Sequence, residues 1–512
     1  AFVHILISNL CYIIFRLAMR KNRPKVALVW LKRDLRWEDH EPISAAIDSG
    51  YPVILWYNFE PILLSDKHYS ARHWHFISES LKDFDGFLQS VDARVLQMYG
   101  SVSDNFIRLS ETFEITSVYS YRETGLKITF DRDKRFSRIL AQDNIPWLEF
   151  NTNGVERGLK HRLGWRDRWE AFMESSISHP LWSKKSVVSS TMLSQVENKM
   201  NLLTLPEDWS IDRQKGGRNM GLRYLNSFLN ERYKNYNRHI SKPLDSRISC
   251  SRLSPYIAFG CLSVKEVFQV TARAYENAKP KRSLSSFRSR LRWQAHFIQK
   301  FEMEDRIEFE PVNRGYLTLN KTINPSFLEA WEKGLTGVPL VDAAMRCLNA
   351  TGYLNFRMRA LLVSFATHHL WLPWQVISPH LARQFLDFEP GIHYPQLQMQ
   401  AGETGINQIR IYSPLSNSVK HDPDAVFILK WVPELANLPQ AFVHNPAALT
   451  PMDEIFYDFR KGIDYPNPIV DLDQARKEAS EKLYRLQKEI SVVSDAKRVL
   501  SKHTLPNRDA FS

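Results

Sequence analysis

Cysteine is scarce in this chain of 512 residues, and the few cysteines that occur are spaced neither as metal ligands nor as a redox pair. No C-x-x-C pair is present. The four positions are Cys11, Cys250, Cys261 and Cys347. We therefore predict no metal site, and we expect reduced thiols in an intracellular, cytoplasmic protein.

Long hydrophobic runs are also missing, apart from one at the start of the sequence. Residues 1–17 are largely apolar, but the run is short for a membrane span and Arg16 interrupts it. It has no convincing signal-peptide cleavage site, and Met19 followed by a basic stretch resembles a natural start. We predict an N-terminal extension over residues 1–23 without stable membrane association. A membrane anchor is the alternative interpretation.

The first part lacks the glycine motifs of common nucleotide-binding folds, although strand and helix patterns alternate there. Neither G-x-G-x-x-G nor a P-loop occurs, so ordinary dinucleotide or NTP binding has no support. One apolar stripe at helical spacing predicts a helix over residues 70–89. The alternation indicates an α/β domain with a doubly wound parallel sheet over residues 24–155. The predicted strands are 26–31, 53–59, 93–99 and 115–121, and the helical stripe is Ile77, Leu81, Phe84 and Leu88.

Acidic residues are outnumbered by basic ones. The chain has 68 Lys and Arg against 56 Asp and Glu, which gives a net charge of +12. Basic side chains displace counterions from a phosphate backbone, so nucleic acid is the leading candidate partner. A hydrophobic content of 44% is typical of a soluble globular protein, and the length favours two domains. We expect a monomer.

Strand signals largely disappear in the second half. Residues 181–219 turn to Ser, Lys, Gln and Asn with a Gly216-Gly217 pair, which predicts a linker crossing the surface. Apolar positions at helical spacing follow, which predicts an all-α domain, and a charged amphipathic helix is predicted over residues 473–490. We place a connecting segment at 156–219, the helical domain at 220–490 and a polar tail at 491–512. The apolar positions include Val341, Ala344, Met345, Leu348, Met358, Leu361 and Phe365.

Four segments resemble conserved blocks of the DNA photolyase and cryptochrome family. Residues 30–42, WLKRDLRWEDHEP, resemble the W-x-R-x-D-L-R-x-x-D-[NH] signature that opens the antenna domain. Residues 251–263, 334–359 and 420–435 resemble blocks of the FAD domain, in the order and spacing of that family. The resemblance covers about residues 25 to 487. It implies bound FAD, and an antenna chromophore of the folate or deazaflavin type, or none, which the sequence does not decide.

The resemblance also implies which residues meet FAD. The hydroxyls in the SRLS stretch, with backbone N–H groups before Pro255, suit a pyrophosphate, and an ordinary helix cap is the alternative. An Arg–Asp pair can stabilise a negatively charged reduced flavin. By resemblance, Tyr236, Ser251, Leu253 and Ser254 contact the phosphates and ribose, Arg359 and Asp387 pair beside the isoalloxazine ring, Glu389 is a second acid near its polar edge, and His393 replaces the usual Asn at its central-ring nitrogen. An imidazole there is titratable.

The activity that the resemblance implies is light-dependent repair of pyrimidine dimers in DNA. Photoexcited reduced FAD donates an electron to the dimer, the cyclobutane ring opens, and the electron returns. Trp293 matches a tryptophan that stacks on the flipped dimer, and Arg357 and Arg410 are candidate phosphate contacts. The implied catalytic residues are Trp293, Arg359, Asp387 and His393.

Other positions depart from the family. Its lesion-contacting Glu, Asn, Met and second Trp align with Arg290, Phe356, Ala360 and Met399. In its tryptophan chain for photoreduction only the middle member, Trp374, is present, because the flanking positions fall at Leu397 and near Lys321. We hypothesise electron transfer through Tyr394, Tyr353 or Trp371. The departures leave a cryptochrome-like blue-light photoreceptor without repair activity as the alternative function, and a nucleotide-binding α/β protein without photochemistry as a third.

Overall fold

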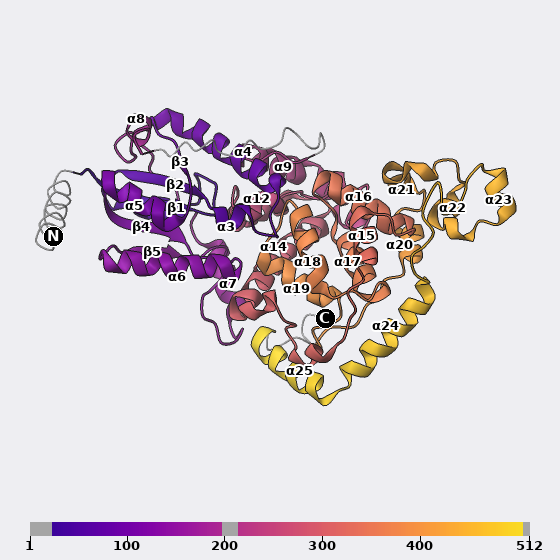
Figure 1. The fold of residues 1–512 in the computed structure, drawn as a ribbon. Helices are drawn as coiled ribbons and strands as arrows, with labels where there is room; N and C mark the ends of the chain where they lie inside the picture. The colour runs from indigo at the N-terminus through magenta and orange to yellow at the C-terminus, as the bar shows by residue number, and fades with distance from the viewer. Residues whose placement is uncertain (1–22, 197–212, 505–512) are drawn as a thin grey trace, which may run out of the picture.

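The structure, a computed structural model, describes residues 23–196 and 213–504. Its first part is a five-stranded parallel sheet with the strand order β3-β2-β1-β4-β5 and helices on both faces (Figure 1). The predicted doubly wound parallel sheet is confirmed. The strands are β1 (Lys25–Leu31), β2 (Val53–Phe59), β3 (Leu96–Tyr99), β4 (Glu114–Tyr121) and β5 (Trp147–Phe150). The main helices here are α2 (Glu41–Asp48), α4 (Ala71–Leu88), α5 (Val102–Thr112) and α6 (Lys127–Gln142), with a short α3 (Pro61–Leu64) after β2.

The central strand β1 is buried on both faces. Ala27, Val29 and Leu31 belong to one apolar cluster, whereas Val26, Leu28 and Trp30 belong to another on the opposite face. Successive side chains of a strand point to opposite faces, so a strand covered on both sides is apolar at every position.

Two strands differ from their prediction. The run 93–99 yields only β3 (Leu96–Tyr99), because the backbone N–H of Val95 donates to Asp85 at 2.7 Å rather than to a neighbouring strand. Strand β5 was not predicted. It pairs with β4 alone at the edge of the sheet, and its four residues are half-buried or exposed, so it lacks the continuous apolar run of the central strands.

Helix α4 joins the sheet to the helical domain. The predicted stripe Ile77, Leu81, Phe84 and Leu88 is buried, as expected, and it belongs to a cluster that also contains Leu253 and Phe259 of the helical domain. The two parts therefore share one apolar core.

The signature at residues 30–42 contacts the FAD-domain block at residues 251–263. The backbone N–H of Leu35 donates to the carbonyl of Phe259 at 3.1 Å, and Arg36 donates to the carbonyl of Gly260 at 3.2 Å. Gly260 has φ +64°, and a Cβ there would lie 2.2 Å from the carbonyl oxygen of Arg33. Only glycine permits this approach, so the two motifs are matched at the domain interface.

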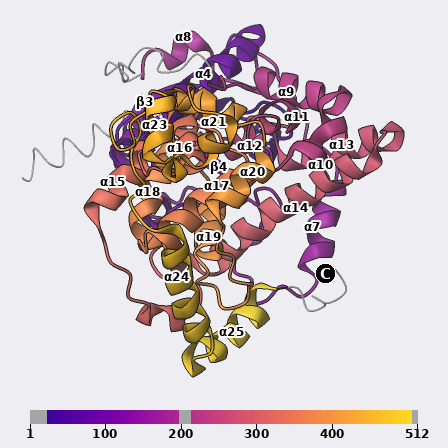
Figure 2. The ribbon, with the colours of Figure 1, turned by 90° about the vertical axis from the view of Figure 1, so that its right-hand side faces the viewer.

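The second half is mostly helical, as predicted (Figures 1 and 2). A separate apolar cluster in it contains the predicted positions Val341, Ala344, Met345 and Leu348. The longest helix, α14 (Lys281–Met303), runs through this domain beside α19 (Pro390–Gln400). The other helices are α7 (Trp165–Glu174), α8 (Ser190–Leu193), α9 (Arg218–Asn230), α10 (Tyr236–His239), α11 (Ser246–Ser249), α12 (Ser254–Ala258), α13 (Val264–Asn277), α15 (Pro325–Lys333), α16 (Pro339–Thr351), α17 (Phe356–Ser364), α18 (Trp374–Gln384), α20 (Pro414–His421), α21 (Val426–Trp431), α22 (Gln440–His444), α23 (Pro451–Phe456), α24 (Leu472–Gln487) and α25 (Ile490–His503).

The predicted linker over residues 181–219 is packed at both of its ends. The backbone N–H of Val188 donates to the carbonyl of Val53, the first residue of β2, at 3.0 Å. A Cβ on Gly216 would lie 2.0 Å from the carbonyl oxygen of Phe76, and the N–H of Gly217 donates to Ser80 on α4. The glycine pair thus permits close packing on α4 rather than a surface crossing. Residues 197–212 lie outside the described residues.

The polar tail predicted from residue 491 is wrong for residues 490–503, which form α25. Val492 and Val499 are buried, and Nε2 of His503 donates a hydrogen bond of 2.6 Å to the carboxylate of Glu304 at the end of α14. The few apolar residues lie on one face, so an overall polar composition concealed an amphipathic helix.

The predicted extension at residues 1–23 lies outside the described residues except for Arg23. Within residues 23–196 and 213–504, none of the helices has the length and apolar character that a membrane span requires.

Candidate flavin site

Arg359 and Asp387 form the ion pair that the sequence predicts. Arg359 lies on α17, Asp387 lies between α18 and α19, and two parallel hydrogen bonds of 3.0 and 2.8 Å join them. Burial alone would raise the pKa of Asp387, but the charge and hydrogen bonds of Arg359, with a further bond from Ser254, hold that pKa below its usual range. The Arg359 side chain remains 27% exposed, so the pair has a free face.

The SRLS stretch is a loop that leads into the short helix α12. Its Arg252 has φ +60°, a left-handed conformation that costs a non-glycine residue about 1–3 kcal/mol. The helix cap is Leu253, which makes no side-chain cap, so the serine hydroxyls are not used as helix caps. Ser251 is half-buried, Ser254 is exposed, and Leu253 is buried. The ordinary cap that was the alternative interpretation is therefore absent at this helix.

Three arginines that sequence reasoning missed surround this loop. Arg232 donates to the carbonyls of Cys250 and of Ser251, the latter at 3.3 Å. Arg247 donates to Thr351 at 3.2 Å, and the Arg252 guanidinium lies 3.7 Å from the ring centroid of Tyr353. Among the described residues, no carboxylate pairs with any of the three.

This cluster concentrates positive charge without compensation. Burial lowers the pKa of Arg232 and of Arg252, and the charges of neighbouring arginines lower both further. Clustered buried cations are costly unless an anion joins them. The loop is thus built to accept a polyanionic group such as a pyrophosphate.

Tyr236 lies beside the same loop, on α10. Its ring packs edge-on against Phe228 and Phe287, and its hydroxyl is close to Arg290 on α14. Arg290, which replaces the family's lesion-contacting Glu, is exposed. The tyrosine therefore connects the loop to the helix that carries Trp293.

Glu389 pairs with the sheet domain. Its carboxylate lies 3.2 Å from Arg33, which follows β1 and also donates to the carbonyls of Phe388 and Ala258. Burial raises the pKa of Glu389, although Arg33 opposes that effect. Glu389, two positions after Asp387, thus links the helical domain to the sheet domain.

His393 is held neutral by its surroundings. It lies on α19 with its Nε2 atom 3.0 Å from the hydroxyl and 3.2 Å from the carbonyl of Ser378. Burial lowers the pKa of His393 to about 3. The sequence suggested an imidazole that titrates; in the folded protein it stays uncharged near pH 7, because burial outweighs its hydrogen bonds.

Of the three proposed routes for electrons, only Tyr394 contacts Trp374 in the described part of the chain. Their rings meet edge to face at 6.0 Å between centroids. Tyr353 lies instead against Arg252, and Trp371 lies between Lys321 and Lys482, whose ammonium groups are 5.2 and 4.8 Å from its ring.

The residues predicted to bind DNA are on accessible surfaces. Trp293 on α14 is 47% exposed and packs on one side against Phe297. Arg410 is exposed, and Arg357 donates to the hydroxyl of Tyr412 at 3.1 Å. Ala360 is buried and Met399 is half-buried, whereas the other two substituted lesion positions, Arg290 and Phe356, are exposed.

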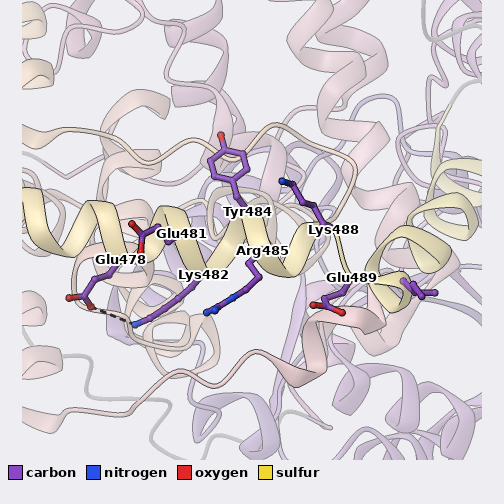
Figure 3. Close-up of a pocket in the computed structure, with 8 residues that line it drawn as sticks. Glu478, Glu481, Lys482, Tyr484, Arg485, Lys488 and Glu489 are labelled. Carbon is purple, nitrogen blue, oxygen red and sulfur yellow. Dashed lines mark ion pairs between the residues drawn. The ribbon is translucent and has the colours of Figure 1, made fainter.

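A hollow lies elsewhere in the described structure. It has a volume of about 680 Å³ and lies along the end of α24 and the start of α25 (Figure 3). Charged side chains of both signs line it, with the Glu478–Lys482 pair at one end. None of the predicted flavin residues lines this hollow.

Comparisons with known proteins agree with this geometry. Residues 27–155 match the DNA photolyase family model, and residues 287–485 match the FAD-binding domain of DNA photolyase. A deoxyribodipyrimidine photo-lyase of Alkalihalophilus pseudofirmus is 24% identical, covering 90% of this chain and 98% of that protein. A cryptochrome DASH of Gloeobacter violaceus is 26% identical, covering 90% and 96%. The solved cryptochrome of Synechocystis is 23% identical, with a TM-score of 0.79 over 90% of this chain and 99% of that one.

The cofactor of the matched domain is FAD, and the residues present fit it. The arginine cluster has the uncompensated positive charge that a pyrophosphate requires, and the partly exposed Arg359 has the donors that a polar ring system requires. FAD contains both a pyrophosphate and a polar ring system, so one molecule suits both features. The chain belongs to the DNA photolyase and cryptochrome family.

Proposed function

We propose that this protein repairs cyclobutane pyrimidine dimers in DNA with blue light. The observation that carries the proposal is the half-exposed Trp293 on α14, one helical turn from the exposed Arg290. Arg290, Arg410 and Lys420 are exposed cations, and none of them pairs with a carboxylate among the residues that the structure describes. Base stacking on an aromatic ring and phosphate contacts to arginines are the two elements that damaged DNA requires.

The proposed roles follow from the geometry. The loop with Ser251 and Ser254 and the three arginines Arg232, Arg247 and Arg252 hold the pyrophosphate. Tyr236 and Leu253 shape the same site, and Arg359 and Asp387 orient the flavin ring, next to His393. When bound, FAD supplies light absorption and one-electron transfer. The protein holds the cofactor, presents Trp293 to the extruded bases, and binds the phosphate backbone through Arg357 and Arg410.

A photoreceptor without repair activity is the second candidate function. Its support is the substitution of the family's lesion contacts by Arg290, Phe356, Ala360 and Met399. Phe356 is 45% exposed, so an apolar ring replaces an amide at that surface. Cryptochrome DASH and deoxyribodipyrimidine photo-lyase are both among the relatives named above.

The test is dimer removal from an irradiated oligonucleotide. The purified protein, with its FAD reduced, is illuminated with blue light, and the remaining dimers are quantified against a dark control. We expect loss of dimers only in the light. Trp293→Ala should lower the rate about 5- to 150-fold, because base stacking on an aromatic ring is worth about 1–3 kcal/mol.

Tyr484→Ala is the matched control, because Tyr484 is also about half exposed, at 45%, but lies on α24. Its repair rate should equal that of the unchanged protein. If the protein binds FAD and photoreduces it but removes no dimers, the repair proposal is wrong and the photoreceptor function is favoured.

A further inference from the structure

Three side chains from the two domains form a continuous hydrogen-bonded chain. The hydroxyl of Tyr394 on α19 lies 2.5 Å from Nε2 of His68, which follows α3 in the sheet domain. The Nδ1 atom of His68 lies 2.6 Å from a carboxylate oxygen of Asp66. Phe388, next to Asp387, stacks on the His68 ring at 5.5 Å with only 3° between the planes. This chain of Tyr394, His68 and Asp66, which we call the relay, is therefore held in place beside the Arg359–Asp387 pair.

The chemistry of the relay fixes where its protons are. Burial would raise the pKa of Asp66, but hydrogen bonds from His68 hold that pKa below its usual range, so Asp66 is a carboxylate that only accepts. Nδ1 of His68 must then carry the proton that it donates to Asp66. In a neutral imidazole the other nitrogen is an acceptor. Tyr394 therefore donates its phenolic proton toward a nitrogen with a free lone pair.

Trp374 and Tyr394 differ in a way that matters for electron transfer. Their rings are in contact, yet the buried indole N–H of Trp374 has no hydrogen-bond partner within the described residues. An aromatic side chain that loses an electron becomes strongly acidic and is stabilised when a base takes its proton. Tyr394 has such a base at 2.5 Å, whereas Trp374 does not. An electron vacancy shared by the two rings therefore settles on Tyr394.

Burial would protect a radical on Tyr394 from solvent, and the hydrogen bond to His68 gives its proton a path. Tyr394 is 3% exposed and His68 is 2% exposed, so neither solvent nor a soluble reductant reaches the phenol directly. Asp66 at the other end of the relay is 15% exposed. The positive charge of a protonated His68 would thus be stabilised by a carboxylate that reaches the surface, and the imidazole ring would not have to move.

We propose that Tyr394 is a redox-active tyrosine whose phenolic proton passes to His68, positioned by Asp66, when the photoexcited oxidised flavin removes one electron. The proposal rests on flavin binding and not on dimer repair. The O–H bond of Tyr394 breaks and an N–H bond forms at Nε2 of His68. The products on the chain are a neutral tyrosyl radical and an imidazolium held by the Asp66 carboxylate. An external thiol, which ends as a disulfide, later returns the electron through the protein without touching the phenol, and the proton goes back from the His68 imidazolium to the phenolate oxygen.

The test is light-induced radical formation in the FAD-loaded protein, followed by transient absorption and by electron paramagnetic resonance in H₂O and D₂O. We expect a neutral tyrosyl signal that forms at least about 1.5-fold more slowly in D₂O, because a proton moves with the electron. Tyr394→Phe should abolish it. Tyr465→Phe, which alters another buried tyrosine of the same domain, one that bonds to Asp342 and lies outside the proposed flavin site, should leave it unchanged.

His68→Gln separates proton transfer from structure. Its amide oxygen can accept the Tyr394 hydrogen bond but cannot take the proton, so the fold is kept and the radical yield should fall at least about tenfold. Asp66→Asn should lower the yield less. An unchanged FAD spectrum verifies the site in each variant. A tyrosyl signal that persists in Tyr394→Phe, or a yield unaffected by His68→Gln, overturns the proposal, whatever the dimer assay shows.

Discussion

At the scale of single residues, uncompensated charge marks the proposed cofactor site. Two buried arginines pair with carboxylates, Arg132 with Glu60 and Glu123, and Arg218 with Glu266. Arg232, Arg247 and Arg252 instead donate to backbone carbonyls or neutral side chains around one loop. Backbone dipoles hold the guanidinium groups in place but leave their charge available. The charge is therefore directed to a ligand rather than to stability.

Removing one of these cations should weaken FAD binding. A hydrogen bond to a charged group contributes about 1.5–3 kcal/mol, so Arg247→Gln should raise the FAD dissociation constant on the order of 10- to 100-fold. Reconstitution of the flavin-free protein, followed by FAD fluorescence, measures the constant. Arg238→Gln on α10, an exposed arginine nearby, is the control. Equal constants for the two variants would show that the cluster does not bind the cofactor.

The residue scale also shows what sequence could predict. The Arg359–Asp387 pair was predicted by resemblance to the family's ion pair, and Arg359 ends one of the segments that resemble the family. The arginine cluster and the Tyr394–His68 contact were missed. His68 and Tyr394 are 326 positions apart, and their contact exists only because the two domains share a core. A sequence carries no local signal for such a pair.

At the scale of elements, short amphipathic segments account for the errors. Strand β5 and helix α25 each bury few residues, so neither has a strong hydrophobic pattern. Periodicity predicted α4, α16 and the central strands because their apolar faces are long. Helix α25 is held by Val492, Val499 and the contact of His503 with Glu304.

The contribution of α25 can be measured with one substitution. Val492 is 1% exposed, and a Cβ on the facing Gly315 would lie 2.6 Å from its Cα, so no space is free. Val492→Asp buries a charge and should lower the free energy of unfolding by at least about 3 kcal/mol. Urea unfolding followed by circular dichroism tests this. Val493→Asp, at a neighbouring position that is 45% exposed, should change little; equal losses in both variants would contradict the packing of α25.

At the scale of the whole molecule, the interior holds many uncharged histidines. Burial lowers the pKa of each of six to about 3 or 4: His73, His368, His369, His380, His393 and His503. They occur in both domains and at α25. Because each must be neutral in the folded protein, the fold as a whole depends on pH.

The sign of that dependence follows from proton binding. An unfolded histidine binds a proton below about pH 6.5, whereas the folded residue does so only near pH 3 or 4. Between these values the unfolded state binds more protons, so stability is complete above pH 6.5 and is lost as the pH falls. For His393 alone, the loss between pH 6.5 and pH 5 is about 2 kcal/mol.

His393→Asn should remove that share of the acid sensitivity, since an amide has no proton to gain in this range. The measurement is the free energy of unfolding of the FAD-loaded protein in urea at pH 7 and at pH 5. The difference between the two pH values should be about 2 kcal/mol smaller in His393→Asn than in the unchanged protein. His161→Asn, at an exposed position, should reproduce the unchanged protein. If His393→Asn loses as much stability on acidification as His161→Asn does, His393 is already protonated in the folded state, and the imidazole beside the flavin carries charge at pH 5.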